Sequence, residues 1–279
     1  MPETRQPTSP PAHLLEDTPR GAGRLPHGFQ MDSHAHREGQ LVYAATGALA
    51  TTTERGTWLA PANRVTWTPP GFPHAHRIYG ETDVRLLAIP VVLCRELPAR
   101  PGVFAVSPVL REVLLALTDR PETRPGAYDR LRAVAVDELI EAPDRSLHLP
   151  EPDDDRLRAV TDLLHADPAH SATLAELGRE VGAGERTLSR LFHTELGMSF
   201  HRWRTVLRIH HGLIHLTNGL SVTETATACG WSNPTSFIEA FTEIVGQTPG
   251  RYQTDLRSPS AADPRPASRS RPDRRTRAR

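Results

Sequence analysis

Two capped helix-turn-helix patterns, about fifty residues apart, constrain the fold of this chain more than any other feature of its sequence. In the first, within residues 173–192, Thr173 precedes Glu176 by three residues, which is the spacing of a capping box at a helix N-terminus. The small residues 182–184, Gly-Ala-Gly, then predict a turn, and leucine and phenylalanine at helical spacing follow it. This stretch therefore predicts two short helices joined by a tight turn.

The second pattern repeats these signals within residues 221–246. Ser221 and Glu224 have the capping-box spacing, and Gly230 marks a turn. Asn233 then supplies an N-cap directly before a proline, which is a favoured first residue of a helix. A second pair of short helices is therefore expected here.

The stretch between the two patterns, residues 199–216, has the length and apolar spacing of one longer helix. Helices that read one face of DNA must lie about one helical turn apart, roughly 34 Å, and a rigid helix between them can set that distance. One such pattern arises in many pairs of helices, whereas two matched patterns are a specific sign of a DNA-binding unit.

The exposed sides of the second helix of each pair are the predicted DNA-contacting surfaces. Arg186 and Arg190, four residues apart, share a helix face that can enter a major groove. The predicted DNA-binding residues are Glu185, Arg186, Thr187, Ser189, Arg190, His193, Asn233, Thr235, Ser236 and Glu239.

Residues 157–253 resemble the DNA-binding domain of the AraC/XylS family of transcription regulators. The matching elements are "LAELGREVG", "RTLSRLF", "ELGMSFHRWR" with Arg208 after it, and the closing "GWSNPTSFIEAFTEIVGQTPGRY". The resemblance implies that double-stranded promoter DNA is the partner. It also implies that the first helix-turn-helix supplies base contacts and the second supplies base or backbone contacts.

The charge of this region is balanced, because residues 156–257 contain ten arginines and ten acids. A strongly positive surface is therefore not the expected source of affinity, and arginines would have to gather on one face. Residues 264–279 at the C-terminus are different, with seven arginines and one aspartate. Such a segment either attracts polyanions or is a solvated tail without a specific function.

Residues 25–95 consist of short β-type runs separated by glycine and proline, which favours a small antiparallel sandwich or barrel. This half resembles a cupin barrel, the usual sensor partner in one branch of the family. The positions that match the two cupin motifs are Gly28, His34, His36, Gln40, Gly47, Pro69, Gly71 and His74.

The cupin resemblance implies a pocket formed by His34, His36, Gln40 and His74, with His34, His36 and His74 at three of the four usual metal positions. Gln40 stands where metal-binding cupins have a glutamate, and a neutral amide binds hard ions less well than a carboxylate. Three imidazoles can still hold a divalent transition metal such as zinc, nickel or copper. Three interpretations stay open: a metal centre, a small-molecule pocket, and structural polar contacts. His76 is assigned no role.

These patterns predict a multi-domain α+β protein: a cupin-like β-barrel, then helices, then an all-α domain with two helix-turn-helix units joined by a long helix. The helices after the barrel pack either on it or on a second copy of the chain, as in a homodimer. No signal peptide or apolar stretch of membrane-spanning length is present, so a cytoplasmic protein without membrane contact is expected. The expected segments are 1–24 disordered, 25–95 sensor barrel, 96–148 helical, 149–155 proline-and-acid linker, 156–257 DNA-binding and 258–279 a disordered arginine-rich tail.

The leading functional hypothesis is a sequence-specific transcription regulator, not an enzyme, whose barrel senses a small-molecule effector. The alternative is a cupin metalloenzyme of the dioxygenase or isomerase type fused to a DNA-binding domain, which Gln40 disfavours. A third hypothesis is a DNA-bound scaffold that recruits RNA polymerase without sensing a ligand.

Overall fold

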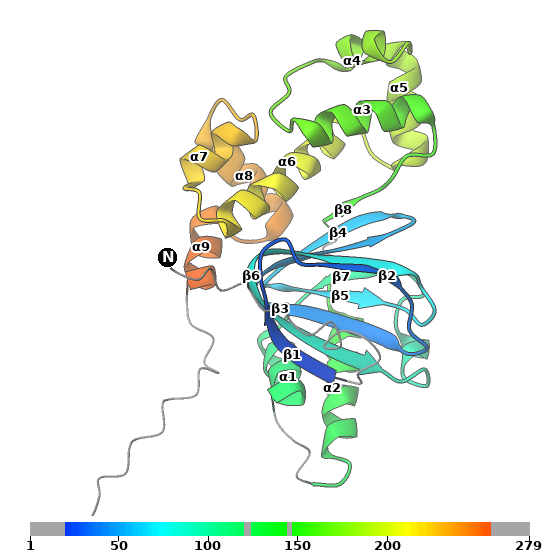
Figure 1. Cartoon of the computed structure of the whole chain (residues 1–279), viewed down its shortest axis with the longest axis vertical. Coiled ribbons are helices and arrows are strands. Elements are labelled where there is room, and N and C mark those ends of the chain that lie inside the picture. The colour runs from blue at the N-terminus through cyan, green and yellow to red at the C-terminus, as the bar shows by residue number, and fades with distance from the viewer. Residues whose placement is uncertain (1–19, 120–123, 144–146, 258–279) are drawn as a thin grey trace, which may run out of the picture.

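The computed structural model describes residues 20–119, 124–143 and 147–257, and folds them into an antiparallel sheet followed by a set of helices (Figure 1). The α+β architecture predicted from the sequence is confirmed. The strands are β1 Arg20–Leu25, β2 Gln30–His34, β3 Gly39–Thr53, β4 Gly56–Pro61, β5 Arg64–Thr68, β6 His74–Ile89, β7 Gly102–Ala105 and β8 His148–Leu149. The helices are η2 Cys94–Glu96, α1 Pro108–Asp119, α2 Ala127–Glu141, α3 Asp155–Ala166, α4 Leu174–Glu180, α5 Glu185–Glu195, α6 Phe200–Thr217, α7 Val222–Ala228, α8 Pro234–Val245 and α9 Pro249–Arg257.

The two long strands β3 and β6 form the centre of the sheet and pair with each other along most of their length. Their register shifts between Ala44 and Thr46 and again between Thr46 and Ala48, and such bulges bend and twist a sheet. Gly47 lies at the bend with φ 79°, and a Cβ atom there would come within 2.3 Å of the Thr82 hydroxyl oxygen. Glycine is therefore required where the two strands curve together.

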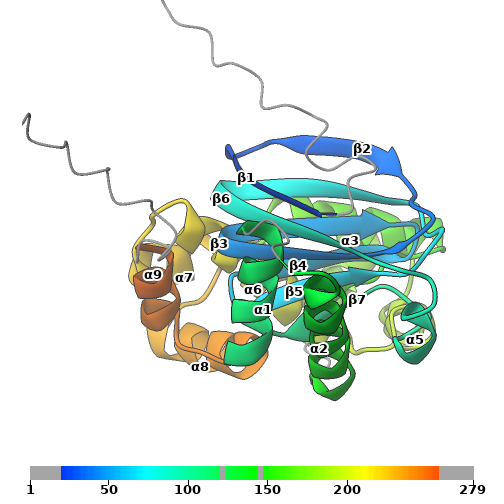
Figure 2. The ribbon, with the colours of Figure 1, turned by 90° about the horizontal axis from the view of Figure 1, so that it is seen from below.

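The two faces of the sheet bury alternate residues of β3. Leu41 and Tyr43 pack in a cluster with the leucines of α1 and α2, whereas Val42 and Ala44 pack in a second cluster with Ile78 and residues of β1, β4 and β6. This is the two-residue period of a strand that is covered on both faces. Figure 2 shows α1 and α2 side by side on the same side of the strands.

The sheet is larger than the sequence predicts. It begins at Arg20, inside the stretch predicted to be disordered, and the remaining residues of that stretch lie outside the described part. The stretch 96–148, predicted to be helical, does hold α1 and α2, but it also contributes β7, which pairs with β5, and part of β8, which pairs with β4. Strands this short depend on their partners rather than on a pattern of their own. The predicted arginine-rich tail, residues 258–279, lies outside the described residues.

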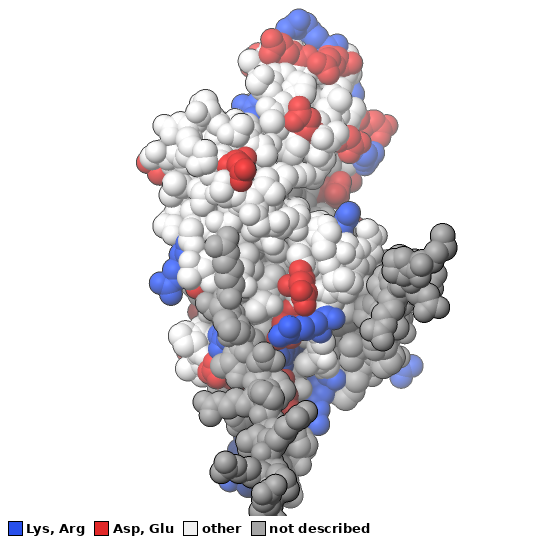
Figure 3. Space-filling view, turned by 60° about the vertical axis from the view of Figure 1, so that its left-hand side comes forward, with Lys and Arg blue, Asp and Glu red and all other residues white. Residues whose placement is uncertain are grey.

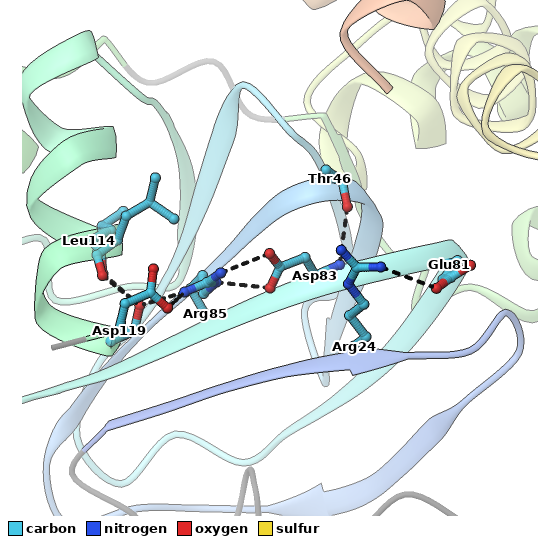
Figure 4. A network of polar contacts seen from close by, with 9 residues as sticks. Arg24, Thr46, Glu81, Asp83, Arg85, Leu114 and Asp119 are labelled. Atoms are coloured by element: carbon cyan, nitrogen blue, oxygen red, sulfur yellow. Dashed lines mark hydrogen bonds and ion pairs between the residues drawn. The ribbon is translucent and has the colours of Figure 1, made fainter. Parts of the chain in front are cut away.

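A buried arginine joins the sheet to α1 (Figure 4). Arg85 of β6 is 5% exposed and forms an ion pair of 2.8 Å with Asp83 and a second ion pair with Asp119 at the end of α1. Its guanidinium also donates to the Thr118 hydroxyl at 3.2 Å. Because the charge is paired and hydrogen-bonded, its burial is tolerated.

The helices α3 to α9 pack around the central helix α6 and share a core with the sheet. Trp203, Leu207 and Leu213 of α6 lie in the same buried cluster as Ala48 and Leu59 of the sheet. In Figure 1, α6 runs between the α4–α5 pair and the α7–α8 pair. None of the described helices has both the length and the apolar character needed to cross a membrane.

Candidate nucleic-acid interface and histidine cluster

The first helix pair forms as its local signals predict. The Thr173 hydroxyl accepts a hydrogen bond from the Glu176 amide at 3.3 Å, and the Glu176 carboxylate accepts from the Thr173 amide at 2.8 Å, so the capping box is complete. The backbone and side-chain hydrogen bonds from Thr173 hold the pKa of Glu176 below its ordinary value. The α4 helix therefore begins at a defined residue, and the turn at residues 181–184 leads directly into α5.

The α5 helix buries one face and presents the other to solvent. Leu188, Leu191 and Phe192 are buried against the helical core. The predicted residues divide by exposure: Glu185, Arg186, Arg190 and His193 are exposed, and Thr187 and Ser189 are half-buried.

The guanidinium groups of Arg186 and Arg190 have no hydrogen-bond or ion-pair partner within the described residues. They lie on the exposed side of α5, four residues apart. Two unpaired arginines on one helix face can bind phosphate or the edge of a guanine base.

The second helix pair has the same construction. Ser221 and Glu224 form a complete capping box at α7, and the Asn233 side-chain oxygen accepts from the Thr235 amide at 2.8 Å at the start of α8. Thr235, Ser236 and Glu239 are exposed on α8, as is Asn233. Since its oxygen caps the helix, Asn233 has only its amide hydrogens left to donate outward.

Two arginines of α6 form hydrogen bonds with the segment that precedes α4. Arg208 donates to the carbonyl oxygens of Pro168 at 2.9 Å and His170 at 3.2 Å, and Arg204 donates to that of Ala172 at 2.9 Å. Burial lowers the pKa of both guanidinium groups from their ordinary value, because the buried charge loses solvation. These arginines therefore serve the packing of the helices rather than an exposed binding face.

Acidic and basic side chains are interspersed over the helices rather than separated. Figure 3 shows acidic side chains beside basic ones at the upper, helical end of the molecule on the face in view. Arg202 of α6 and Glu243 of α8 form an exposed ion pair of 2.8 Å, which joins these two helices. Mixed charge agrees with the equal numbers of arginines and acids in this region, so local contacts must supply the preference for a binding partner.

Four histidines and Gln40 form a polar cluster at one end of the sheet. His34 pairs with His74 across β2 and β6, and their ring centroids are 4.5 Å apart. His74 and His76 lie two residues apart on β6, with their ring centroids 5.0 Å apart. Residues two apart on a strand face the same side of the sheet. This spacing in the sequence could have indicated that His76 belongs to the cluster with His74.

The convergent set of histidines differs from the predicted metal set by one residue. Ligand atoms of His34, His74 and His76 all lie within 4.8 Å of one another, whereas His36 Nε2 lies 2.8 Å from the Gln40 amide nitrogen. The Gln40 oxygen lies 3.1 Å from His74 Nε2 and 3.3 Å from His76 Nε2. Gln40 thus lies at the centre of the cluster, and His76 joins it.

The hydrogen bonds of the cluster leave the Nε2 atom of His34 available as a ligand. His34 Nδ1 donates to the Asp32 carbonyl oxygen at 2.7 Å, and His74 Nδ1 donates to that of Phe72 at 2.9 Å. A neutral imidazole has one proton, so the Nε2 atom of His34 then carries a lone pair, whereas the Nε2 atom of His74 contacts the Gln40 side chain at 3.1 Å. The Nε2 atom of His34 is buried and has no hydrogen-bond partner among the described residues.

Burial keeps the buried rings of the cluster neutral. It lowers the pKa of His74 to about 4 and that of His76 well below its ordinary value, because the charged form loses solvation. Neutral imidazoles held through Nδ1, with Nε2 turned inward, are the arrangement that protein metal sites use. The residues present therefore fit a divalent transition metal bound by His34, His74 and His76, with the Gln40 amide beside it.

Comparisons with known proteins concern both halves of the chain. A family model described as "Helix-turn-helix domain" matches residues 177–255. Over 237 residues the chain is 32% identical to the HTH-type transcriptional regulator NimR of Escherichia coli (strain K12). The aligned residues make up 84% of this chain and 86% of NimR. It is also 32% identical over 105 residues to the HTH-type transcriptional regulator RipA of Corynebacterium glutamicum. That alignment makes up 38% of this chain and 32% of RipA.

The solved structures found are more distant in sequence. ToxT from Vibrio cholerae with unsaturated fatty acid bound is 12% identical with a TM-score of 0.38, over 85% of this chain and 95% of that one. A DNA-binding transcriptional dual regulator from Escherichia coli K-12 is 25% identical with a TM-score of 0.35, over 37% of this chain and 94% of that one.

Proposed function

We propose that α5 and α8 are the two DNA-reading helices of this chain, because the chain belongs to the AraC family of helix-turn-helix transcription regulators. The protein is a DNA-binding transcription regulator, and its named relatives are regulators rather than enzymes. The relatives named above give no support to the metalloenzyme alternative.

The observation that carries the proposal is the pair of exposed arginines on α5, which have no partner among the residues that the structure describes. Arg186 and Arg190 can each form a bidentate contact with the O6 and N7 atoms of guanine, the commonest specific contact in a major groove. Glu185, Thr187, Ser189 and His193 flank them on the same helix. The first pair of helices is thus a helix-turn-helix unit that reads bases.

The α8 helix offers different side chains from α5 to the second of two DNA half-elements that lie one helical turn apart. Thr235 and Ser236 are short hydroxyl side chains in its first turn, suited to phosphate or base edges, and the Asn233 amide adds a donor. Glu239 is an acceptor for the amino group of cytosine. A rise of 1.5 Å per residue makes the 18-residue α6 helix roughly 27 Å long, a length suited to helices that enter successive grooves roughly 34 Å apart.

The sheet is proposed to be a cupin-like sensor whose effector binds at the cluster of His34, His36, Gln40, His74 and His76. A bound zinc, nickel or copper ion would offer an open coordination position to the effector. The buried Nε2 of His34, which has no hydrogen-bond partner in the described part of the chain, supports this site. The effector regulates DNA binding only if its affinity differs between two arrangements of the sheet and the helices. A homodimer and contact with RNA polymerase stay predictions of the sequence.

Binding-site selection from randomised duplexes with the purified full-length protein tests the DNA-reading proposal. We expect an enriched motif with two half-elements one helical turn apart, and Arg186→Ala should relax the base preference in one half-element. Arg179→Ala, which removes an exposed arginine of α4, is the matched control and should leave the motif unchanged. An absence of enrichment, or a motif that Arg186→Ala and Arg190→Ala leave intact, would contradict the proposal.

Metal titration tests the sensor site. Isothermal titration calorimetry with zinc should give one site per chain, which His74→Ala and His76→Ala each remove and His201→Ala, an exposed control on α6, leaves in place. If zinc binds equally to the His74→Ala and His76→Ala proteins, or does not bind to the parent protein, the cluster is a polar ligand pocket or a structural element without a metal.

A further inference from the structure

An arginine of the sheet binds the C-terminal end of the second DNA-reading helix. Arg64, the first residue of β5, donates from Nη2 to the backbone carbonyl oxygen of Val245, the last residue of α8. The neighbouring Asn63 amide approaches the same oxygen at 3.4 Å, and the other Arg64 amino group, Nη1, donates to the Asn63 carbonyl oxygen at 3.0 Å. Arg64 is only 5% exposed, so this contact lies inside the junction between the sheet and the helices.

The contact satisfies a need that α8 does not meet itself. The last carbonyl oxygens of a helix have no partner within the helix, and its C-terminus carries a partial negative charge that a cation stabilises. The α8 helix, all of whose residues are described, has no basic side chain in its last turn. Arg64 supplies that cation from a residue about 180 positions earlier in the chain.

This hydrogen bond adds to the apolar core shared by the sheet and the helices, in which Val245 itself is buried. Beside it lies a crevice of about 450 Å³ lined by Tyr43 of β3, Asn63, Arg111 of α1 and Tyr252 of α9. The chain turns away from α8 at Gly246, which has φ 85°, and a Cβ atom there would lie 3.3 Å from Arg64 Nη2. Arg64 therefore adds a buried charged donor at the end of α8, where Ile244 and Val245 also pack in the apolar core.

The strand that carries Arg64 also reaches the histidine cluster. Thr68, the last residue of β5, lies opposite Gln40 in the β3–β5 register, and both side chains are buried. Directly opposed residues of an antiparallel pair point to the same face. One five-residue strand thus has the cluster at one end and α8 at the other.

We propose that Arg64 is the positioning residue of α8: through this carbonyl contact the sheet sets how α8 meets the second half-element of the DNA site. This inference rests on the proposed function of α8 as a DNA-reading helix. Removing the guanidinium should free the C-terminal turn of α8 and weaken contacts at the second half-element, while α5 and the first half-element are unaffected.

Hydrogen exchange of the DNA-free, full-length protein tests the positioning itself. In Arg64→Gln we expect the amides of the last turn of α8, including Gly246, to exchange about fivefold faster, with no change in α5. Arg64→Lys keeps the charge with fewer donors and should give a smaller increase in the exchange rate of the same amides. This variant also replaces Arg64→Gln as the test protein if Arg64→Gln does not fold. Arg85→Gln removes an equally buried arginine that contacts α1, so it should spare α8. Unchanged exchange at the end of α8 in both Arg64 variants would overturn the proposal.

DNA binding by the same proteins tests the consequence. On a selected duplex, Arg64→Gln should raise Kd about fivefold, and this difference should disappear when the second half-element is scrambled. Equal weakening on both duplexes would contradict a role confined to α8. If the parent protein shows no base preference, the DNA-reading proposal fails, and the exchange experiment alone then decides whether Arg64 positions α8.

Discussion

The guanidinium of Arg208 lies over the indole of Trp231, 5.7 Å from the ring centroid, and so links the central helix α6 to the turn before α8. The same group donates to the carbonyl oxygens of Pro168 and His170, which precede α4. One side chain therefore connects both helix pairs to α6. The relative placement of the two pairs depends on this residue as well as on the apolar core.

Replacing Arg208 should destabilise the helical region. Arg208→Ala removes two hydrogen bonds from a charged, half-buried donor, and we expect it to lower the free energy of unfolding by about 3 kcal/mol. Urea denaturation followed by circular dichroism measures this change. Arg179→Ala, at an exposed arginine, should stay within about 0.5 kcal/mol of the parent protein. A similar loss in both variants would show that the Arg208 contacts contribute little.

Removing one arginine of α5 should weaken specific DNA binding. If Arg186 or Arg190 contacts a guanine in bidentate fashion, its replacement by alanine costs about 1–3 kcal/mol of binding free energy and relaxes the preference at that base. Gel-shift titrations on the selected duplex and on single-base variants measure both effects. Uniform weakening on every duplex would instead assign the arginine to phosphate.

Deleting residues 258–279 should act differently from the α5 variants. The segment is rich in arginine, so its loss should lower affinity by a similar factor on all sequences and flatten the dependence of affinity on salt. Titrations at several salt concentrations on specific and random duplexes measure this. Unchanged affinity at low salt would show that the tail takes no part in binding.

Gly230 should tolerate no side chain. It has φ 78°, and a Cβ atom would lie 2.7 Å from the Ala169 Cα atom, so Gly230→Ala adds both backbone strain and a clash. We expect a loss of about 2 kcal/mol or more in the free energy of unfolding. Gly250→Ala in α9 has open space around it and should be neutral or stabilising by up to about 1 kcal/mol. Equal thermal unfolding of the two variants would contradict the structure at this turn.

The stability of the protein should fall as pH decreases below about 6.5 because of His210. Burial lowers the pKa of His210 to about 3, and its Nε2 atom has no hydrogen-bond partner in the described part of the chain. Between these two pKa values the unfolded state binds a proton that the folded state does not, so unfolding is favoured as pH falls. Urea denaturation between pH 7 and pH 4 should show this slope.

His210→Leu should reduce that slope, whereas His201→Gln, at an exposed position of the same helix, should leave it unchanged. An identical slope in the His210→Leu protein would assign the effect to other groups, of which His211 is the nearest candidate. Burial lowers the pKa of His211 to about 4.

Much of the helical region could be predicted from the sequence because its signals are local. A capping box such as Thr173 with Glu176 spans three residues, and the turns at Gly182 and Gly230 depend on single backbone conformations. The exposed faces of α5 and α8 followed from helical spacing alone. The resemblance to a cupin barrel also placed Gln40 in one pocket with His36 and His74, and these side chains contact one another in the structure.

The membership of His76 in that cluster, the strand at Arg20 and the link from Arg64 to Val245 were decided only by the tertiary structure. Each depends on segments far apart in the chain: β2 must pair with β6 in one register, and β5 must end against α8. A shift of one residue in such a register turns a side chain to the opposite face of the sheet. A single sequence carries no local signal for that choice, because the partner strand or helix supplies the hydrogen bonds that determine it.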